Sequence, residues 1–209
     1  MNKQILYTIY ENLYEFLNYR NLQPITEKYK NSIEFYDNIN YNKYIYILSI
    51  SNNIKNYNIN NIKEKVTYII LLHYQSEYDS KTAEFKKLIN TIEYKNCDII
   101  IISKDKLSTH VSKQINILST NYKKIFSYSY NLFKIVIPKH ILCSPHRILN
   151  KEEIDEILHN NLESKKIYIS KILIDDPMCV WIGGKKGDVI LIERLSEITA
   201  ESICLRYVI

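Results

Sequence analysis

The chain has 209 residues, a net charge of +5, and 46% hydrophobic and 24% charged residues. This composition is close to that of ordinary globular proteins, so it excludes a wholly disordered or collagen-like chain. No stretch reaches the roughly 18 to 20 uncharged apolar residues of a membrane span, and the N-terminal segment has no cleavable apolar core, so we expect a soluble, unsecreted protein with no membrane contact.

The first elements follow from hydrophobic periodicity. Four apolar residues of the segment 2–19 fall on one helical stripe: Ile5, Ile9, Leu13 and Phe16. The stripe predicts an amphipathic helix that ends before Pro24. Residues 43–50 and 66–72 are apolar on both faces and rich in Ile and Tyr, which predicts two covered strands joined by an Asn-rich loop.

Two more helix-then-strand pairs complete the first part. Apolar residues recur at helical spacing over 81–94, and the apolar run 98–102 then predicts a strand. A second helix is expected from Ser108, a favourable N-cap, and a strand over 125–130. We therefore expect residues 1–137 to form an α/β domain.

Composition changes near Pro138. Residues 1–137 hold 18 cationic and 12 acidic side chains, a net charge of +6, whereas residues 138–209 hold 10 and 11, a net charge of −1. The second part also contains all three glycines, three of the four prolines and the single tryptophan. These turn-rich features predict a separate small α+β domain, so the expected fold class is α+β overall.

Within the second part, a helix and two strands are indicated. Asn150 with Glu153 forms an Asn variant of the capping box, which predicts a helix ending near His159. Asp176 and Pro177 begin a new segment. The glycine-rich residues 183–187 predict a tight turn, and strands are expected over 188–193 and 203–209, joined by a loop.

Three side chains in a short segment have the chemistry of metal ligands: His140, Cys143 and His146. A zinc site is one interpretation, with a distant cysteine as the fourth ligand. The favoured alternative is that the histidines form hydrogen bonds beside a proline turn, because the chain offers no second close pair of ligands. The four cysteines have no paired short spacings and are expected to be reduced thiols, mostly buried.

Two catalytic interpretations are weak. The triplets at 79–81, 84–86 and 93–95 have the acid-x-lysine spelling of a metal-dependent nuclease, but they fall on or beside a predicted helix, where a solvated face explains them. Residues 183–187 lack the spacing of a phosphate-binding loop and precede a strand rather than a helix. The basic surplus of residues 1–137 is compatible with contacts to a phosphate backbone or with an ordinary solubilising surface.

The second part resembles a known family, the shared fifth subunit of nuclear RNA polymerases, whose archaeal counterpart corresponds to this part alone. The match is an ordered series: a His-x5-His turn, a helix, Asp-Pro, Gly-x3-Gly, Arg-x-Ser-Glu and a closing arginine. In this chain the series falls on His140, His146, Asp176, Pro177, Gly183, Gly187, Arg194, Ser196, Glu197 and Arg206.

The chain departs from the family pattern in its last loop. Leu195 replaces the usual proline, and residues 198–200 end in Ala200 where the family typically has glycine. Residues 205–208 read Leu-Arg-Tyr-Val in place of Tyr-Arg-Leu-Val. These departures put the shape of that loop in doubt.

The resemblance implies a non-catalytic subunit of a DNA-directed RNA polymerase with no cofactor, metal or catalytic residue. Its C-terminal module would dock on the largest subunit, and residues 1–137 would form a jaw domain of nuclease-like topology beside the downstream duplex DNA. A metal-dependent nuclease and a free-standing nucleic-acid-binding regulator remain the alternatives.

The roles of the matched residues are open. Gly183 and Gly187 either let another part of the molecule approach their backbone closely or merely supply a positive φ. Arg194 and Arg206 either contact a partner or form internal pairs with Glu197 or Glu193.

Isoleucine, asparagine, lysine and tyrosine are unusually frequent, and all four are encoded by AT-rich codons. Together with the jaw and the altered loop, this bias favours a homologue from a large cytoplasmic DNA virus, acting in the host cytoplasm and the virion. The nucleus of an AT-rich eukaryote is the alternative location.

Overall fold

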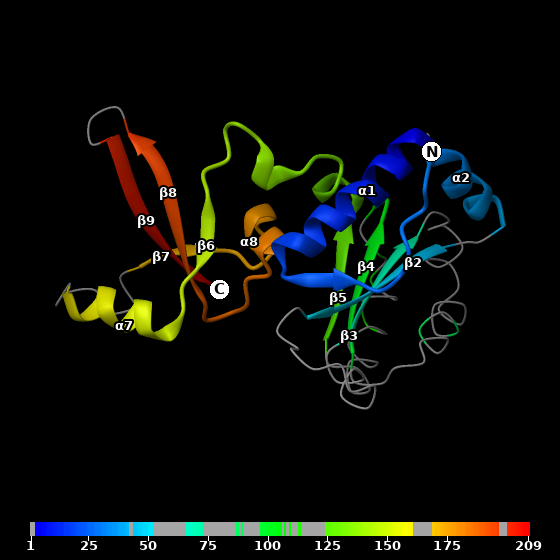
Figure 1. Ribbon diagram of the computed structural model, residues 1–209. Coiled ribbons are helices and arrows are strands. Elements are labelled where there is room, and N and C mark those ends of the chain that lie inside the picture. The colour runs from blue at the N-terminus through cyan, green and yellow to red at the C-terminus, as the bar shows by residue number, and fades with distance from the viewer. Residues whose placement is uncertain are drawn as a thin grey trace. The chain divides into compact units, whose positions relative to one another are not determined.

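The computed structural model divides into two compact units, Met1–Lys134 and Ile135–Ile209 (Figure 1). Both units mix helices and strands, so the α+β class predicted from the sequence is confirmed. The structure describes residues 3–41, 44–51, 66–72, 97–105, 124–160, 169–196 and 200–209, together with the isolated residues 87, 89, 107, 109 and 113. None of the helices in these segments is long and apolar enough to cross a membrane.

The N-terminal unit contains a five-stranded sheet in the order β1-β2-β3-β4-β5. The strands are β1 (Leu22–Pro24), β2 (Tyr44–Ser51), β3 (Val66–Leu72), β4 (Asp98–Ser103) and β5 (Lys124–Ser129). Strand β2 is antiparallel to both β1 and β3, whereas β3, β4 and β5 run parallel. The four longer strands lie where the apolar runs predict them, within one residue at each end.

The central strand β3 is buried along its whole length, as expected for a strand covered on both faces. Val66, Tyr68, Ile70 and Leu72 point to one core cluster, which also contains Ile99 and Ile101 of β4. The intervening residues of β3 are buried as well and face the other way. Figure 1 shows helix α1 (Lys3–Tyr19), the predicted amphipathic helix, lying across the sheet.

Strand β1 and helix α2 of this unit were not predicted. Strand β1 contains Pro24, which pairs with Ser49, and proline is tolerated here because β1 is an edge strand. Helix α2 (Ser32–Tyr41) begins after Asn31, whose side chain accepts a hydrogen bond from the Glu34 amide at 2.9 Å. Phe35 of α2 packs against Tyr10 of α1 with ring centroids 4.8 Å apart, and Ile39, one helical turn later, is buried as well.

The predicted strand over 125–130 is one residue too long at its C-terminal end. Tyr130 starts the 3-10 helix η1 (Tyr130–Leu132), and the Ser129 hydroxyl accepts a hydrogen bond from the Asn131 amide. The buried Tyr130 hydroxyl donates to the carbonyl of Leu72 at the end of β3. The predicted helices at 81–94 and from Ser108 lie almost wholly outside the described residues. Only residues 87, 89, 109 and 113 of these segments are described, all four are helical, and the buried Ile89 joins the core cluster on β3.

The C-terminal unit contains a four-stranded sheet in the order β6-β8-β9-β7. The strands are β6 (His146–Ile148), β7 (Ser170–Ile172), β8 (Val189–Ser196) and β9 (Ala200–Val208). Strands β6, β8 and β9 are antiparallel neighbours, and β7 runs parallel to β9. The strands β6 and β7 were not predicted, and the hairpin β8–β9 is longer than the predicted segments 188–193 and 203–209.

Each face of the C-terminal sheet is covered by one helix. Helix α7 (Lys151–Asn160), which the capping-box pattern predicts, contributes Ile154 to a core cluster with Val189 and Leu191. Helix α8 (Pro177–Ile182) contributes Cys179 to a second cluster with Ile190, Ile192 and Val208. The sequence predicts a new segment at Asp176 but not that this segment is a helix.

Ala200, at the start of β9, has a positive φ of 61°. Because this left-handed conformation is costly for a residue with a Cβ, we expect Ala200→Gly to raise the free energy of unfolding by about 1 kcal/mol. Ser202→Gly, in the extended part of the same strand, is the matched control and should lower it instead. Chemical denaturation of both variants checks this, and an Ala200→Gly variant less stable than the parent chain would contradict the backbone assignment.

Candidate functional site in the C-terminal unit

A short turn precedes β6 and carries two exposed apolar side chains. The Cys143 amide donates to the carbonyl of His140 at 2.8 Å, which closes a β-turn over residues 140–143. The Leu142 amide donates to Nδ1 of His140 at 3.3 Å, so the imidazole supports the turn from its first position. Ile141 and Leu142 occupy the tip and are 93% and 85% exposed. The turn therefore holds two large apolar side chains out in solvent.

The second histidine of the segment also bonds to the backbone. Nδ1 of His146 lies 2.6 Å from the carbonyl oxygen of Ser144, an acceptor, so this nitrogen carries the proton. His146 begins β6, where it pairs with Ile192 of β8.

The third residue of the candidate metal site is Cys143. Burial, aided by the nearby Asp176 carboxylate, raises the pKa of the Cys143 thiol. Among the residues that the structure describes, no three His, Cys, Asp or Glu side chains gather as metal ligands would.

The four cysteines are free thiols. Cys97 and Cys179 are buried, and Cys143 and Cys204 are half-buried, so the expectation of mostly buried thiols holds for two of the four. Burial raises the pKa of Cys97 to about 11, which keeps this thiol protonated and unreactive at neutral pH.

The Asp176-Pro177 pair starts helix α8. The Asp176 carboxylate accepts hydrogen bonds from the amides of Met178 at 2.9 Å and Cys179 at 3.4 Å, and Pro177 occupies the first helical position. This is the favoured N-terminal arrangement, since an acidic cap satisfies the free amides and proline has no amide to leave unpaired. Both residues therefore fix where α8 begins.

Two glycines end α8 in a Schellman motif. The Gly183 amide bonds to the Val180 carbonyl and the Gly184 amide to the Cys179 carbonyl, with Gly183 in the left-handed conformation at φ 77°. A Cβ on Gly184 would lie 2.5 Å from Sγ of Cys179, closer than atoms approach. The glycine that is closely approached is therefore Gly184, which contacts the Cys179 side chain and which the sequence pattern did not single out. Gly183 supplies the positive φ.

The remaining glycine turns the chain into β8. Gly187 has φ 95°, and its amide donates to the Val208 carbonyl at 3.0 Å. The Lys185 amide donates to the Asp188 carboxylate at 2.8 Å, and the Asp188 amide donates back to the Lys185 carbonyl. Because these amides bond within the chain, residues 183–187 form a turn and do not present a phosphate cradle.

Arg194 and Arg206 lie on the same face of the C-terminal sheet. Arg206 pairs with Ile190, which packs against α8, so Arg206 lies on the α8 face of the sheet. Arg194 lies two residues after Ile192, which is also on this face, so strand alternation directs Arg194 to the same face. Glu193 points to the opposite face, which disfavours it as an internal partner of Arg194. Ser196 ends β8, and Glu197 lies outside the described residues.

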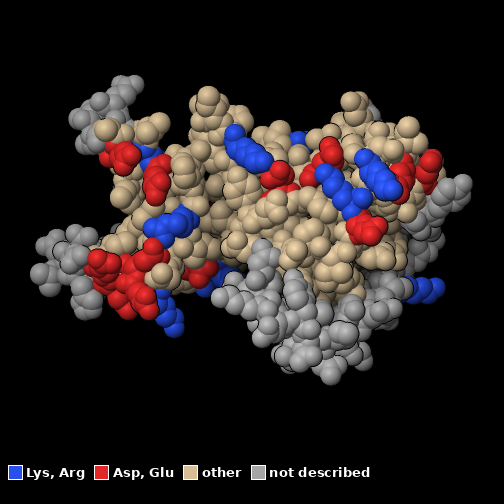
Figure 2. Space-filling model, in the orientation of Figure 1, with Lys and Arg blue, Asp and Glu red and all other residues tan. Residues whose placement is uncertain are grey.

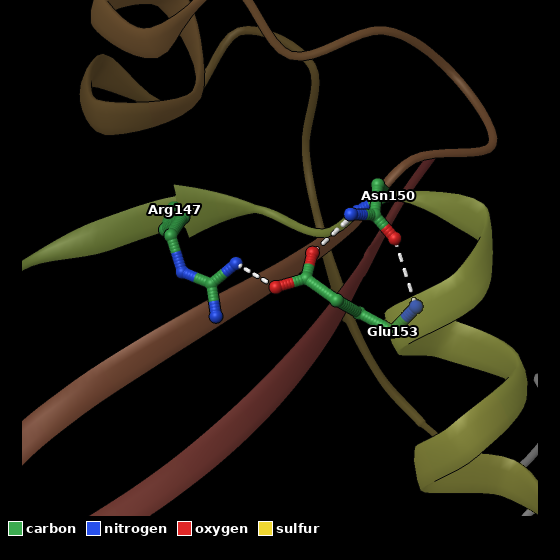
Figure 3. A network of polar contacts seen from close by, with 3 residues as sticks. All are labelled: Arg147, Asn150 and Glu153. Atoms are coloured by element: carbon green, nitrogen blue, oxygen red, sulfur yellow. Dashed lines mark hydrogen bonds and ion pairs between the residues drawn. The ribbon is translucent and has the colours of Figure 1, made fainter.

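Arg147 forms a polar network that the sequence only partly predicts (Figure 3). The Glu153 amide donates to Oδ1 of Asn150, and the Asn150 amide donates to Oε2 of Glu153, both at 2.8 Å, which confirms the predicted capping box. The other carboxylate oxygen of Glu153 lies 2.5 Å from Nη1 of Arg147 on β6. The network thus ties the edge strand β6 to the first turn of α7.

Comparison with known proteins gives a consistent match. The family described as RNA polymerase Rpb5, C-terminal domain, matches residues 135–208. The DNA-directed RNA polymerase RPB5 homolog of African swine fever virus (strain Badajoz 1971 Vero-adapted) is 25% identical over 206 residues, which cover 94% of this chain and 93% of that protein.

Archaeal relatives match the C-terminal part. The DNA-directed RNA polymerase subunit Rpo5 of Archaeoglobus fulgidus is 38% identical over 76 residues, which are 36% of this chain and 99% of that protein. The Rpo5 of Methanocaldococcus jannaschii is 40% identical over 74 residues, covering 35% of this chain and 92% of that protein.

The Glu153 network makes the stability of the C-terminal unit depend on pH. The Asn150 amide and then the Arg147 guanidinium hold the pKa of Glu153 below its usual 4.5. The carboxylate therefore stabilises the fold above pH 4.5, and this contribution is lost as the pH falls through the lowered pKa. We expect Glu153→Gln to lower the Tm at pH 7 and to differ less from the parent chain as the pH falls below 4.5.

The matched control is Glu156→Gln, an exposed acid on the same helix, which should lower the Tm less at pH 7. Thermal melts of both variants followed by circular dichroism across the pH range check the expectation. A Tm difference for Glu153→Gln that stays constant with pH would contradict it.

Proposed function

The chain belongs to the RPB5 family of DNA-directed RNA polymerase subunits, and from this premise we propose that its C-terminal unit docks on the largest subunit while its N-terminal unit lies beside the downstream DNA. It is a non-catalytic subunit of the polymerase, so nucleotide addition belongs to other chains. Two parts of this proposal go beyond family membership: which surface docks, and what the N-terminal unit does.

The observation that carries the docking proposal is the turn at residues 140–143. Ile141 and Leu142 are almost fully exposed, yet hydrogen bonds from Cys143 and to His140 fix their backbone. Burying such a side chain contributes about 1.5 to 3 kcal/mol, and a pre-ordered turn loses little entropy on binding. The turn is thus suited to insert into an apolar recess of the largest subunit, with His140 and His146 holding it in shape.

The remaining residues of the family motif divide into two roles. Asp176, Pro177, Gly183 and Gly187 build the caps and turns around α8, so their role is to shape the unit. Arg194, which Ser196 and Glu197 follow in sequence, shares one face of the sheet with Arg206. The planar guanidinium groups of both arginines suit bidentate contacts with carboxylates of a neighbouring subunit.

The N-terminal unit is proposed to act as a jaw of nuclease-like topology without catalytic function. Its support is electrostatic, since residues 1–137 have a net charge of +6 and residues 138–209 a net charge of −1. Such an excess attracts a phosphate backbone without reading sequence. The acid-x-lysine triplets of the nuclease alternative lie outside the described residues.

The proposed location is the host cytoplasm and the virion of a large DNA virus. RPB5 homologs of African swine fever virus match nearly the whole chain, whereas the archaeal Rpo5 relatives named above match the C-terminal part. The presence of the N-terminal unit therefore favours the viral context over the archaeal one, with the nucleus of a eukaryote as the alternative.

The docking proposal predicts that the apolar tip is required for assembly. We expect Ile141→Ser combined with Leu142→Ser to reduce the affinity for the largest subunit at least tenfold, since two buried side chains are lost. The Tm of the free chain should not change, because both side chains are exposed. Leu173→Ser, another exposed leucine of the same unit, is the matched control. Undiminished recovery of the largest subunit in a pull-down of the double variant would reject this surface.

The jaw proposal predicts DNA contact from the N-terminal unit once the chain is held in the polymerase. Photoreactive nucleotides placed in the downstream duplex should crosslink to peptides from residues 1–134, with a yield that falls steeply between about 50 and 200 mM salt. Peptides from residues 135–209 are the internal control. Tight binding of the duplex by the free chain would instead favour a free-standing DNA-binding protein.

A further inference from the structure

The hairpin β8–β9 extends beyond the helices that cover its sheet (Figure 1). We call residues 193–196 and 200–203 the distal hairpin. In the other half, Val189 and Leu191 pair with Tyr207 and Leu205, and this face packs against Ile154 of α7. Among the described residues, the core cluster on this face stops there.

On the same face, the distal hairpin exposes two large apolar side chains. Leu195 is 94% exposed and Ile203 is 69% exposed. The register pairs Leu195 with Glu201 and Glu193 with Ile203, so the two apolar residues are diagonal neighbours, roughly 7 to 8 Å apart. They form one small apolar patch with a carboxylate directly across from each. Both side chains are accessible to another chain, because no helix among the described residues covers them.

The surroundings of the patch are acidic. Helix α7 lies on this same face of the sheet and exposes Glu152, Asp155 and Glu156, and Figure 2 shows acidic side chains on both α7 and the hairpin. Of the cations on this face, Arg147 is paired with Glu153, and Lys151 lies at the start of α7. Lys171 of β7 pairs with Tyr207 and is exposed on this face as well, at the end of the sheet away from the distal hairpin. Arg194 points to the opposite face. The charge therefore repels nucleic acid and attracts a cationic protein segment.

We propose that this face of the distal hairpin binds a segment of another polymerase subunit in which lysine or arginine residues flank an apolar side chain. The apolar side chain of that segment covers Leu195 and Ile203, and its cations lie against Glu193. This surface uses residues other than the apolar turn at Ile141 and Leu142, and the proposal rests on the proposed function only in requiring assembly into the polymerase.

The test is photo-crosslinking within the assembled polymerase. The full-length chain carries a photoreactive amino acid in place of Leu195 and, in a matched control, in place of Leu173, an exposed leucine of the same unit. We expect position 195 to crosslink to a lysine- or arginine-rich segment of another subunit, and position 173 not to reach that segment. Adding Glu193→Lys should lower the crosslink yield at position 195 by about fivefold, because an attractive charge becomes repulsive.

Three outcomes decide the proposal. A crosslink from position 195 to an acidic segment overturns it, as does no crosslink to any subunit when the chain has co-purified with the polymerase. An unchanged yield with Glu193→Lys overturns the charge assignment and with it the stated partner chemistry. If the unmodified chain does not co-purify with polymerase subunits, the proposed function fails first, and this result is read separately from the crosslink.

Discussion

Strand alternation in the hairpin β8–β9 is the constraint from which the C-terminal unit is built. Successive residues of β8 from Val189 to Ile192 are all buried, so apolar side chains leave both faces of the sheet and each face needs its own helix. Helix α7 covers one face and α8 the other. Residues that look unrelated in sequence, such as Asp176, Gly184 and Glu153, all serve to start, end or anchor these two short helices.

Short helices have little intrinsic stability, so their ends decide whether they form. Helix α8 has only six residues, and it is held by the Asp176 cap, by Pro177 and by a Schellman motif at Gly183. Helix α7 is joined to β6 through the contact between the Arg147 guanidinium and the Glu153 carboxylate. These end contacts hold the two helices against the sheet, whereas the turn at residues 140–143 is held by its own hydrogen bonds to His140.

Elements with a clear aliphatic pattern were predictable, and three-residue strands were not. The run 66–72 is strand β3 residue for residue, because seven consecutive apolar or β-branched side chains have no favourable place except a covered strand. The three-residue strands β1, β6 and β7 have no periodicity to detect and exist because a longer neighbour supplies their hydrogen bonds. Helix α2 was missed because it buries few side chains, Phe35 and Ile39, and Phe35 is held by ring contacts with Tyr7 and Tyr10 of α1 that no spacing in the sequence reveals.

The sequence by itself determined the family, the α+β class and the capping box of α7, since each depends on residue types at fixed spacings along the chain. Only the tertiary structure decided which glycine approaches a side chain closely, on which face Arg194 and Glu193 lie, and that Ile141, Leu142, Leu195 and Ile203 are exposed. The physical reason is that exposure depends on what packs against a residue. An isoleucine in a strand has the same local pattern whether a helix covers it, as α8 covers Ile190, or no described element does, as at Ile203.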